Sequence, residues 1–301
     1  MSEPPGVVRD AIVGGRAPIF GIPSGSLRLL SLGGNRMAQA GLACVAVVTL
    51  LALLSPLLAP LDPMAPGDLS REVLLPPGPG HLLGTDQLGR DVWSRLLVGT
   101  RVSLAIALSA VGLSVGAGVL LGATAGYLGG WVDAMVMRAA DVVLAVPRIV
   151  LLVAVIAILE PSLPVIVLLL AFTQWPAPAR LIRAEILSLK TRDFVEAGRA
   201  LGFSGSRILF RHLIPNALAP VLVAATLGVG HMVILEAGLS YLGLGVDLSW
   251  GAMLRDGQTY ILTAWWLATF PGLAIALVAV SFNLLGDGIR DAMDPLQGPG
   301  R

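Results

Sequence analysis

The sequence predicts an all-α membrane protein with six transmembrane helices, and three observations lead to this fold class. First, 55% of the 301 residues are hydrophobic and 13% are charged, about half the charged fraction of an average soluble domain. Second, uncharged stretches long enough to cross a bilayer, which takes about 20 residues, cover residues 37–61, 102–132, 161–179, 212–235 and 257–286. Third, Lys and Arg are distributed unevenly between the segments that join these stretches.

The remaining transmembrane helix, third in chain order, is predicted between residues 137 and 159. Residues 149–159 are uncharged but too short to cross a bilayer alone, so the helix must extend back past Arg148 and Asp141, with a bend at Pro147. Asp141 can pair with Arg138, three residues earlier. Ionisable residues at membrane depth are often functional. Asp141 and Arg148 are therefore candidate pathway or gating residues, and a structural charge pair is the alternative.

The basic residues predict that both termini are cytoplasmic, because cytoplasmic loops are enriched in Lys and Arg. With the N-terminus inside, most of the 20 basic residues are cytoplasmic. The exceptions are Arg71, Arg90, Arg95, Arg101 and Arg255. Residues 1–36 and 292–301 are then cytoplasmic tails. Residues 1–36 lack an apolar core followed by a cleavage site, so we expect no signal peptide.

Residues 62–98 are predicted to form an extracytoplasmic loop that contains a helix at the membrane surface. Residues 61–80 are rich in Pro and Gly and cannot form a packed unit alone. The helix is expected to open at Thr85 or Asp86, with Trp93 on its apolar side at the interface. The charged residues of this helix are expected to be more exposed: Arg90, Asp91 and Arg95.

Glycines recur at four-residue spacing in the second predicted span. They are Gly112 and Gly116, followed by Gly118, Gly122 and Gly126. Small residues at this spacing let two helices approach closely in a membrane. We expect a packing face here, and a pore lining is the alternative.

Residues 192–220 are the most polar and basic segment in the second half of the chain, and their pattern predicts a helical hairpin outside the membrane. Asp193 and Glu196 have the spacing of a helix-opening capping box. Gly202 lies where a helix would end in a left-handed residue. Ser204 can cap a second helix over residues 206–213, and Pro215 is expected to bend the chain into the next span.

This hairpin resembles the loop signature of ABC-transporter permease subunits. The matching residues are Glu196-Ala197-Gly198, Gly202 and Ile214-Pro215. The chain departs from the family pattern at Gly198, where a second Ala is usual, at His212, where Ile is usual, and at Ile214, where Leu is usual. The run 211–216 is similar to the version in dipeptide, oligopeptide and nickel permeases.

Further segments resemble the same subfamily, so the resemblance covers residues 81–295. They are residues 83–86, 89–91 and 94–95 before the second span, 236–245 and 249–251 before the last span, and 286–291 with 294–295 at the end. The resemblance implies a type I ABC importer permease core of five transmembrane helices over residues 99–291, preceded by a first helix over 37–61.

The resemblance also implies partners and roles for particular residues. The hairpin would be the coupling helix that docks on a cytoplasmic ATPase, through Asp193, Glu196, Ala197, Gly198, Leu201, Gly202, Arg211 and Pro215. A substrate-binding protein outside would contact Asp86, Arg90, Asp91, Trp93 and Trp250. Two ATPase subunits with ATP and Mg, and a second homologous permease subunit, would complete a transporter in the cell membrane of a prokaryote.

Several kinds of chemistry are not expected in this chain. The only lysine, Lys190, has no preceding glycine loop, which excludes a Walker A motif. The single cysteine, Cys44, excludes internal disulfides and cysteine-based metal sites. We expect no bound cofactor, no metal site and no nucleic-acid partner, and no enzymatic activity in this chain, because ATP hydrolysis belongs to separate subunits.

His231 and Glu236 fall in the outer half of the fifth predicted span and are further pathway candidates. For His231, a structural histidine within the helix bundle is the alternative. An ion-driven carrier would need carboxylates at mid-depth, which most of the spans lack, and an intramembrane hydrolase would need a nucleophile beside His231. Di- or oligopeptides are the expected substrates, with a nickel chelate or another small solute as the alternative.

Overall fold

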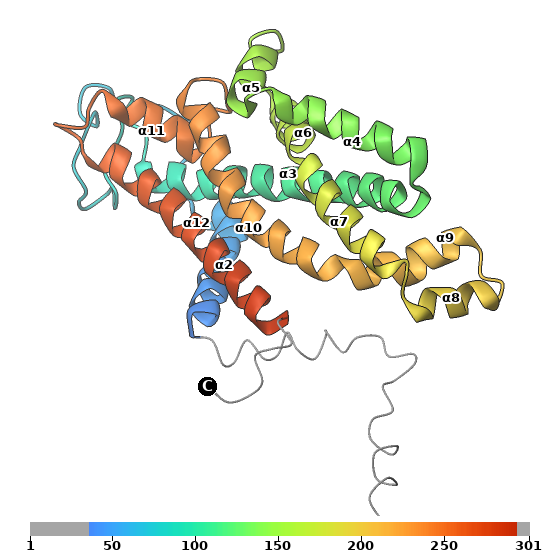
Figure 1. Cartoon of the computed structure of the whole chain (residues 1–301). Coiled ribbons are helices and arrows are strands. Elements are labelled where there is room, and N and C mark those ends of the chain that lie inside the picture. Colours follow the sequence, from blue (N-terminus) through green and yellow to red (C-terminus); the bar gives the residue numbers. More distant parts are fainter. Residues whose placement is uncertain (1–35, 294–301) are drawn as a thin grey trace, which may run out of the picture.

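The computed structural model describes residues 36–293, and within this range all regular structure is helical (Figure 1). In chain order the elements are α2 (Arg36–Leu58), α3 (Val92–Leu128), α4 (Gly130–Ala145), α5 (Arg148–Ile156), α6 (Leu163–Gln174), α7 (Pro176–Leu189), α8 (Asp193–Ala200), α9 (Gly205–Arg207), the π-helical turn η2 (Ile208–Leu213), α10 (Ile214–Tyr241), α11 (Trp250–Gln258) and α12 (Trp266–Met293). The predicted tails lie almost entirely outside the described residues.

Four helices are individually long and apolar enough to cross a membrane: α2, α3, the continuous helix Gly205–Tyr241, and α12. Two further spans are bent pairs. Helices α4 and α5 meet at 82° and helices α6 and α7 at 41°. Counting each pair as one span gives six, which confirms the predicted fold class. The first bend lies at Pro147, as predicted, since a proline interrupts helical hydrogen bonding.

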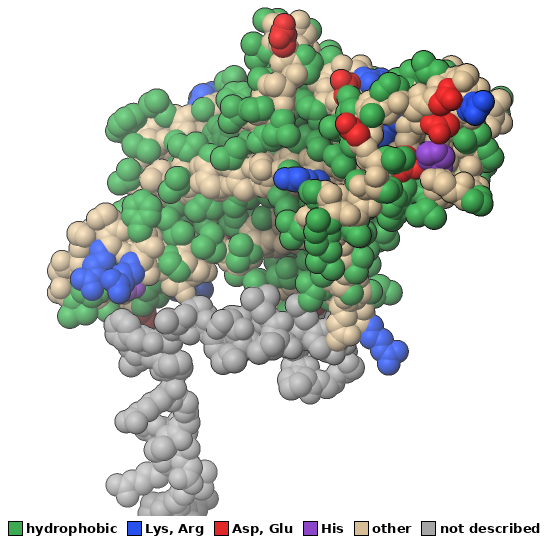
Figure 2. All heavy atoms as spheres, turned by 180° about the vertical axis from the view of Figure 1, so that it is seen from behind, with side chains coloured by type: hydrophobic (Ala, Val, Ile, Leu, Met, Phe, Trp, Pro, Cys, Tyr) green, Lys and Arg blue, Asp and Glu red, His purple; other side chains and the backbone are tan. Residues whose placement is uncertain are grey.

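The molecule has two polar ends. At one, called the loop end, lie residues 59–91, α11 and the turns beside it; at the other, called the hairpin end, lie α8, α9 and η2 (Figure 1). Charged side chains gather mainly at these two ends, and the surface between them is largely hydrophobic (Figure 2). This is the distribution expected when the middle of the protein contacts lipid.

The interior contains two main hydrophobic cores. The loop-side core joins α2, α3, α5, α6, α10, α11 and α12 around residues such as Ile106, Met232 and Trp250. The hairpin-side core joins α3, α7, α8, η2 and α10 around residues such as Ile182 and Leu213. Val115, halfway along α3, packs against both cores.

Helices α3 and α7 pack closely through the predicted glycine face. A Cβ on Gly118 would lie 2.9 Å from the carbonyl oxygen of Trp175, and one on Gly126 would lie 3.0 Å from that of Arg183. A Cβ on Gly122 would overlap the carbonyl of Ala179. These three glycines therefore form a packing face. Gly112 and Gly116 differ, because nothing lies within 4 Å of the space that a Cβ would occupy.

The prediction of a surface helix that opens at Thr85 or Asp86 is wrong in two respects. The helix starts later, and it is not separate from the second span. Residues 86–89 form a turn closed by the Gly89 amide, which donates to the Asp86 carbonyl at 3.0 Å. The helix begins at Val92 with Asp91 as its N-cap, and it continues without a break through the second span to Leu128. No proline interrupts the helix between this cap and Leu128, so the first turns extend the span.

The predicted end of the second hairpin helix at residue 213 is also wrong. Helix α10 begins at Ile214 directly after η2, and residues 205–241 form one continuous helix. Proline has no N–H to donate to the preceding turn. The wider π-helical turn accommodates this loss, with the Ile214 N–H donating to the carbonyl of Leu209. The hairpin is thus joined rigidly to the fifth span.

Candidate functional site

The hairpin, defined here as residues 193–213, begins after α7 reaches the end of α3. Lys190 Nζ donates a hydrogen bond to the carbonyl of Gly126 at 3.0 Å, which ties the two helix ends together. The predicted capping box is absent, because Arg192 is the N-cap and no side chain caps α8. Asp193 and Glu196 lie instead in the first turn, where negative charges stabilise a helix N-terminus.

The glycine elbow after α8 is confirmed. Gly202 has φ +77°, a conformation that favours glycine. The Phe203 N–H donates to the carbonyl of Gly198 at 3.0 Å, and the Gly202 N–H donates to that of Arg199 at 2.9 Å. This pair of bonds is a Schellman motif. It satisfies the last carbonyls of α8 and turns the chain back.

Phe203 is the centre of the hairpin. Its ring stacks on His212 with centroids 5.7 Å apart, and the Arg207 guanidinium lies 4.1 Å from its centroid. A Cβ on Gly198 would lie 3.3 Å from the Phe203 ring. The glycine that departs from the permease signature therefore leaves room for this aromatic side chain. The predicted Ser204 cap is confirmed, with its hydroxyl accepting from the Arg207 N–H at 3.4 Å.

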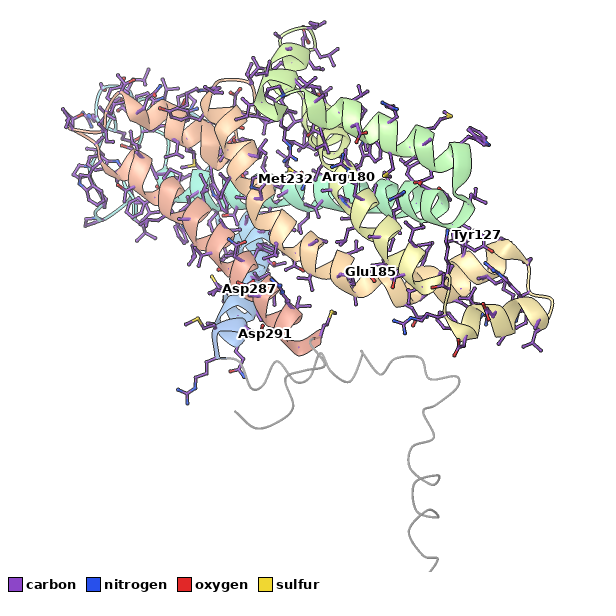
Figure 3. All side chains as sticks on the ribbon, viewed as in Figure 1. Tyr127, Arg180, Glu185, Met232, Asp287 and Asp291 are labelled. Atoms are coloured by element: carbon purple, nitrogen blue, oxygen red, sulfur yellow. The ribbon has the colours of Figure 1, made fainter. Side chains whose placement is uncertain are left out.

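One side of the hairpin is buried against three spans. Val195, Ile208 and Leu213 join the hairpin-side core together with side chains of α3, α7 and α10. Gly205 lies against the hydroxyl of Tyr127 at the end of α3, which Figure 3 places beside the hairpin. A displacement of the hairpin would therefore move these three spans with it.

The other side of the hairpin is exposed and partly apolar. Leu201 is 66% exposed and Phe210 54%, and Phe194 is exposed as well. Of the predicted coupling residues only Gly198 is buried; the others are exposed, namely Asp193, Glu196, Ala197, Leu201, Gly202, Arg211 and Pro215. We call this surface the exposed hairpin face. Apolar side chains among charges on a surface outside the spans are typical of a protein contact.

At the loop end, a buried ion network replaces the exposed charges that the sequence predicts. Asp86 is 1% and Arg95 3% exposed. Asp86 Oδ2 accepts from Arg90 Nε and from Arg95 Nη1, each at 2.6 Å, and Arg95 Nη2 donates to Asp256 of α11 at 2.9 Å. Asp91 is buried as the cap of α3 and accepts from the Ser94 N–H at 2.8 Å. The expectation of exposed charges is wrong because this loop folds onto α3 and α11.

The aromatic candidates at the loop end separate into buried and partly exposed side chains. Trp250 is 1% exposed, and its Nε1 donates to the carbonyl of Leu96 at 3.2 Å. A side chain so placed holds α11 to α3 and offers no surface to another protein. Trp93 is partly exposed. Of the predicted binding-protein contacts, it alone keeps a side chain that is not buried.

The charged candidates within the spans do not converge on one site. Asp141 pairs with Arg180 of α7 at 2.6 Å and not with Arg138, and both members of this pair are exposed. Arg148 has no ion-pair partner among the described residues, and His231 lies exposed on α10. Glu236 is buried and accepts from the Ser240 hydroxyl at 2.7 Å. The expected Arg138 pair is wrong because α7 lies alongside α4.

Two partners in these interactions have no signal in the sequence. Asp256 completes the loop-end network from 161 residues away, and Arg183 of α7 donates hydrogen bonds from Nε and Nη2 to the two carboxylate oxygens of Asp133 of α4. Their spacing gives no indication of these contacts. Only the alternating basic and apolar residues of 176–189, which place Arg180 and Arg183 along α7, suggest a helix with a charged side.

Comparison with known proteins identifies the family of the chain. The profile of the family described as "Binding-protein-dependent transport system inner membrane component" matches residues 118–297. A second profile, "N-terminal TM domain of oligopeptide transport permease C", matches residues 30–77.

Among curated proteins, the chain is 40% identical to the dipeptide transport system permease protein DppC of Alkalihalophilus pseudofirmus, covering 87% of this chain and 86% of that protein. It is 39% identical to DppC of Haemophilus influenzae, covering 87% and 91%. It is 37% identical to the oligopeptide transport system permease protein OppC of Bacillus subtilis, covering 89% and 88%. The chain therefore belongs to the family of binding-protein-dependent transport system inner membrane components, and it is a multi-pass membrane permease.

Proposed function

We propose that this chain forms half of the pathway of an ATP-driven importer of di- and oligopeptides, and that the hairpin passes motion from ATPase subunits to the spans. The observation that carries the proposal is the two-sided hairpin. Its exposed face presents Phe194, Leu201 and Phe210 outside the spans, and its buried face is packed into α3, α7 and α10.

The proposal requires partners that the chain does not contain. Two ABC ATPase subunits, with ATP and Mg, would bind the hairpin end on the cytoplasmic side. A second homologous permease subunit would supply the other half of the pathway. A substrate-binding protein would meet the loop end outside, and both termini would be cytoplasmic. The distribution of Lys and Arg supports this orientation, and ATP hydrolysis would take place in the partner subunits alone.

Coupling follows from differential binding. Closure of the ATPase dimer can shift the permease between inward and outward access only if the ATPases bind the hairpin differently in the two states. The Schellman turn at Gly202 and the continuous helix Gly205–Tyr241 make the hairpin stiff. A displacement at its exposed face therefore reaches the fifth span without being absorbed by a flexible joint.

The loop end has a different proposed role. The network of Asp86, Arg90, Arg95 and Asp256 connects the loop, the start of α3 and α11. We assign these side chains, with Asp91 and Trp250, to holding that surface in shape for a binding protein, while Trp93 and exposed neighbours make the contact. The names of the relatives, which are dipeptide and oligopeptide permeases, support peptide as the substrate over a nickel chelate.

A charge placed on the exposed hairpin face tests the proposal. Leu201→Glu should abolish co-purification of ATPase subunits with the tagged chain and reduce uptake of labelled Ala-Ala to background. The matched control is Leu82→Glu, the same change at a leucine of the loop end that is 69% exposed, which should leave ATPase binding intact. Retained ATPases and normal uptake in Leu201→Glu would refute the docking role, and uptake of labelled nickel but not Ala-Ala by the unmodified complex would refute the peptide assignment.

A further inference from the structure

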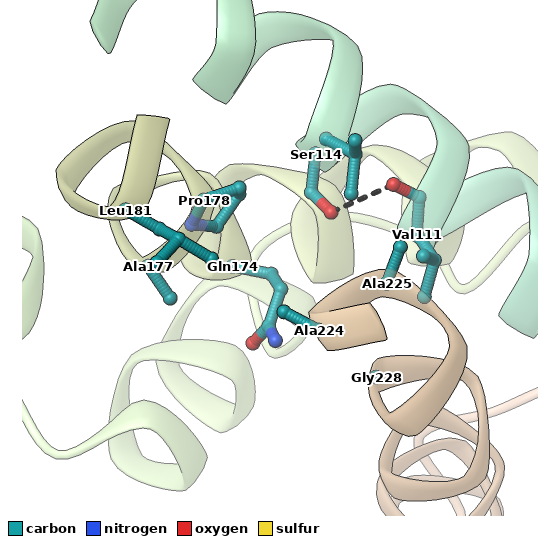
Figure 4. Close-up of a pocket in the computed structure, with 10 residues that line it drawn as sticks. Val111, Ser114, Gln174, Ala177, Pro178, Leu181, Ala224, Ala225 and Gly228 are labelled. Atoms are coloured by element: carbon teal, nitrogen blue, oxygen red, sulfur yellow. Dashed lines mark hydrogen bonds between the residues drawn. The ribbon is translucent and has the colours of Figure 1, made fainter. Parts of the chain in front are cut away.

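A hollow of about 310 Å³ lies between α3, the α6–α7 bend and α10 (Figure 4). Its wall comes from the middle of the spans, namely residues 111–115 of α3, 174–181 around the bend, and 224–228 of α10. Val115 in this wall packs against both the loop-side and the hairpin-side core. The hollow is therefore at mid-depth, where the two halves of the subunit meet.

The wall of the hollow is apolar except for two side chains, and none of its residues is charged. The Ser114 hydroxyl is already engaged, donating to the carbonyl of Val111 at 2.9 Å. Gln174 is not engaged in this way. Its Oε1 atom is buried and accepts no hydrogen bond from any described residue, and its amide points into the space facing Ala224 (Figure 4).

Gln174 lies at the bend between α6 and α7, where its amide oxygen needs a hydrogen-bond donor. Gln174 is the last residue of α6, and Pro176 begins α7 at an angle of 41°. Lipid chains carry no donor for the amide oxygen, and an unsatisfied polar group in hydrocarbon is costly. The surface around Gln174 is therefore expected to meet a polar partner in the working transporter, which can be water, a solute in transit or another protein chain.

We infer that Gln174 is a solute-contacting residue of the transmembrane pathway and accepts a hydrogen bond from the main-chain N–H of a peptide in transit. The inference rests on the proposed function. A neutral amide in an uncharged wall recognises the hydrogen-bonding backbone that peptides share and not the charge of their side chains. The volume is at the lower end of the roughly 300–1,000 Å³ typical of small-molecule sites, which suits a short peptide.

Cysteine accessibility in the intact complex tests this inference. Cys44 is the only cysteine of the chain, so Cys44→Ala removes its background thiol. In that variant, Ala224→Cys places a thiol in the hollow. Leu222→Cys is the matched control on the same helix: it lies outside the hollow on the surface between the two polar ends, where lipid would shield the thiol from water. The probe is a trimethylammonium-ethyl methanethiosulfonate, which reacts with thiols in contact with water, and mass spectrometry reads its addition to this chain.

We expect the Ala224→Cys thiol to react at least tenfold faster than the Leu222→Cys thiol, the reaction to slow severalfold during turnover with saturating Ala-Ala, and uptake to stop after modification. Gln174→Leu should lower Ala-Ala uptake at least tenfold while ATPase co-purification stays normal, and Gln174→Asn should keep part of the activity. Lys-Ala and Glu-Ala should lose uptake in the same proportion as Ala-Ala.

Two outcomes would overturn the inference while leaving the proposed function intact. One is normal Ala-Ala uptake by Gln174→Leu. The other is a protected Ala224→Cys thiol that cross-links to the second permease subunit, because the hollow would then be filled by a protein side chain. Failure of the unmodified complex to take up any of these peptides is a separate result that refutes the proposed function and, with it, the peptide contact of Gln174.

Discussion

Replacing Gly122 with Ala should loosen the contact between α3 and α7 and lower the stability of the folded protein, whereas the same change at Gly116 should raise that stability. Both glycines lie in α3, so the change in intrinsic helix stability is shared: alanine is favoured over glycine by about 1 kcal/mol in a helix interior. At Gly116 nothing lies within 4 Å of the new methyl group. Gly116→Ala should therefore keep this gain in full.

At Gly122 the methyl group would overlap the backbone carbonyl of Ala179 and would lie 2.6 Å from Cγ2 of Ile182. A carbonyl inside a helix cannot rotate away, so α3 and α7 must separate. Overpacking of this kind costs about 1–3 kcal/mol, and a clash with backbone belongs at the upper end. After the helix gain is subtracted, Gly122→Ala should lose about 2 kcal/mol, which leaves the two variants about 3 kcal/mol apart.

Thermal unfolding of the purified complex in detergent measures this difference. About 2–4 °C per kcal/mol is expected for a chain of this size, so the unfolding midpoint should fall several degrees in Gly122→Ala and rise slightly in Gly116→Ala. The hairpin is anchored by the same α3–α7 pair, so Gly122→Ala should also uncouple ATP hydrolysis from uptake. Equal midpoints for the two variants would refute the close packing of α3 on α7.

Three further substitutions separate buried from exposed interactions. Arg95→Met should cost about 3–5 kcal/mol, because it leaves the buried Asp86 carboxylate short of a partner; the exposed Arg71→Met is the control, and equal midpoints would contradict the network. Gly202→Ala should destabilise the folded hairpin turn by about 1–2 kcal/mol, since φ +77° is unfavourable for alanine. Because the hairpin is the proposed docking surface, reduced co-purification of ATPase subunits measures the effect. Asp141→Asn should change stability by less than about 1 kcal/mol, because its pair with Arg180 is exposed; a large drop in the midpoint would show that the pair is buried in the assembled complex.

The features that the sequence predicted correctly are local. Gly202, the Ser204 cap and the bend at Pro147 depend on backbone geometry within a few residues, and each was found where expected. The spans were predictable because hydrocarbon requires about 20 apolar residues in a row. The errors arose where a local signal was ambiguous, as at Pro215, where a π-helical turn allows the helix to continue.

The permease resemblance of the hairpin could be recognised from residues 196–215. Which side of the hairpin faces the spans could not be predicted. Which of its side chains are buried depends on α3, α7 and α10, and these are brought to it by folding. In the same way, burial of Arg95 could not be predicted, because a charged residue is expected to be exposed unless a partner is known. Its partner Asp256 is remote in sequence.

By itself, the sequence determined the all-helical membrane fold, the six spans and the polar hairpin between the fourth and fifth, since all of these follow from the cost of placing charge and unpaired backbone in lipid. The tertiary structure alone decided which glycines face α7, that the loop-end charges are buried as a network, and that Gln174 faces a hollow at mid-depth. Each of these depends on contacts between helices far apart in the chain, and such contacts follow from the shape of the packed surfaces and not from the order of residues along any one helix.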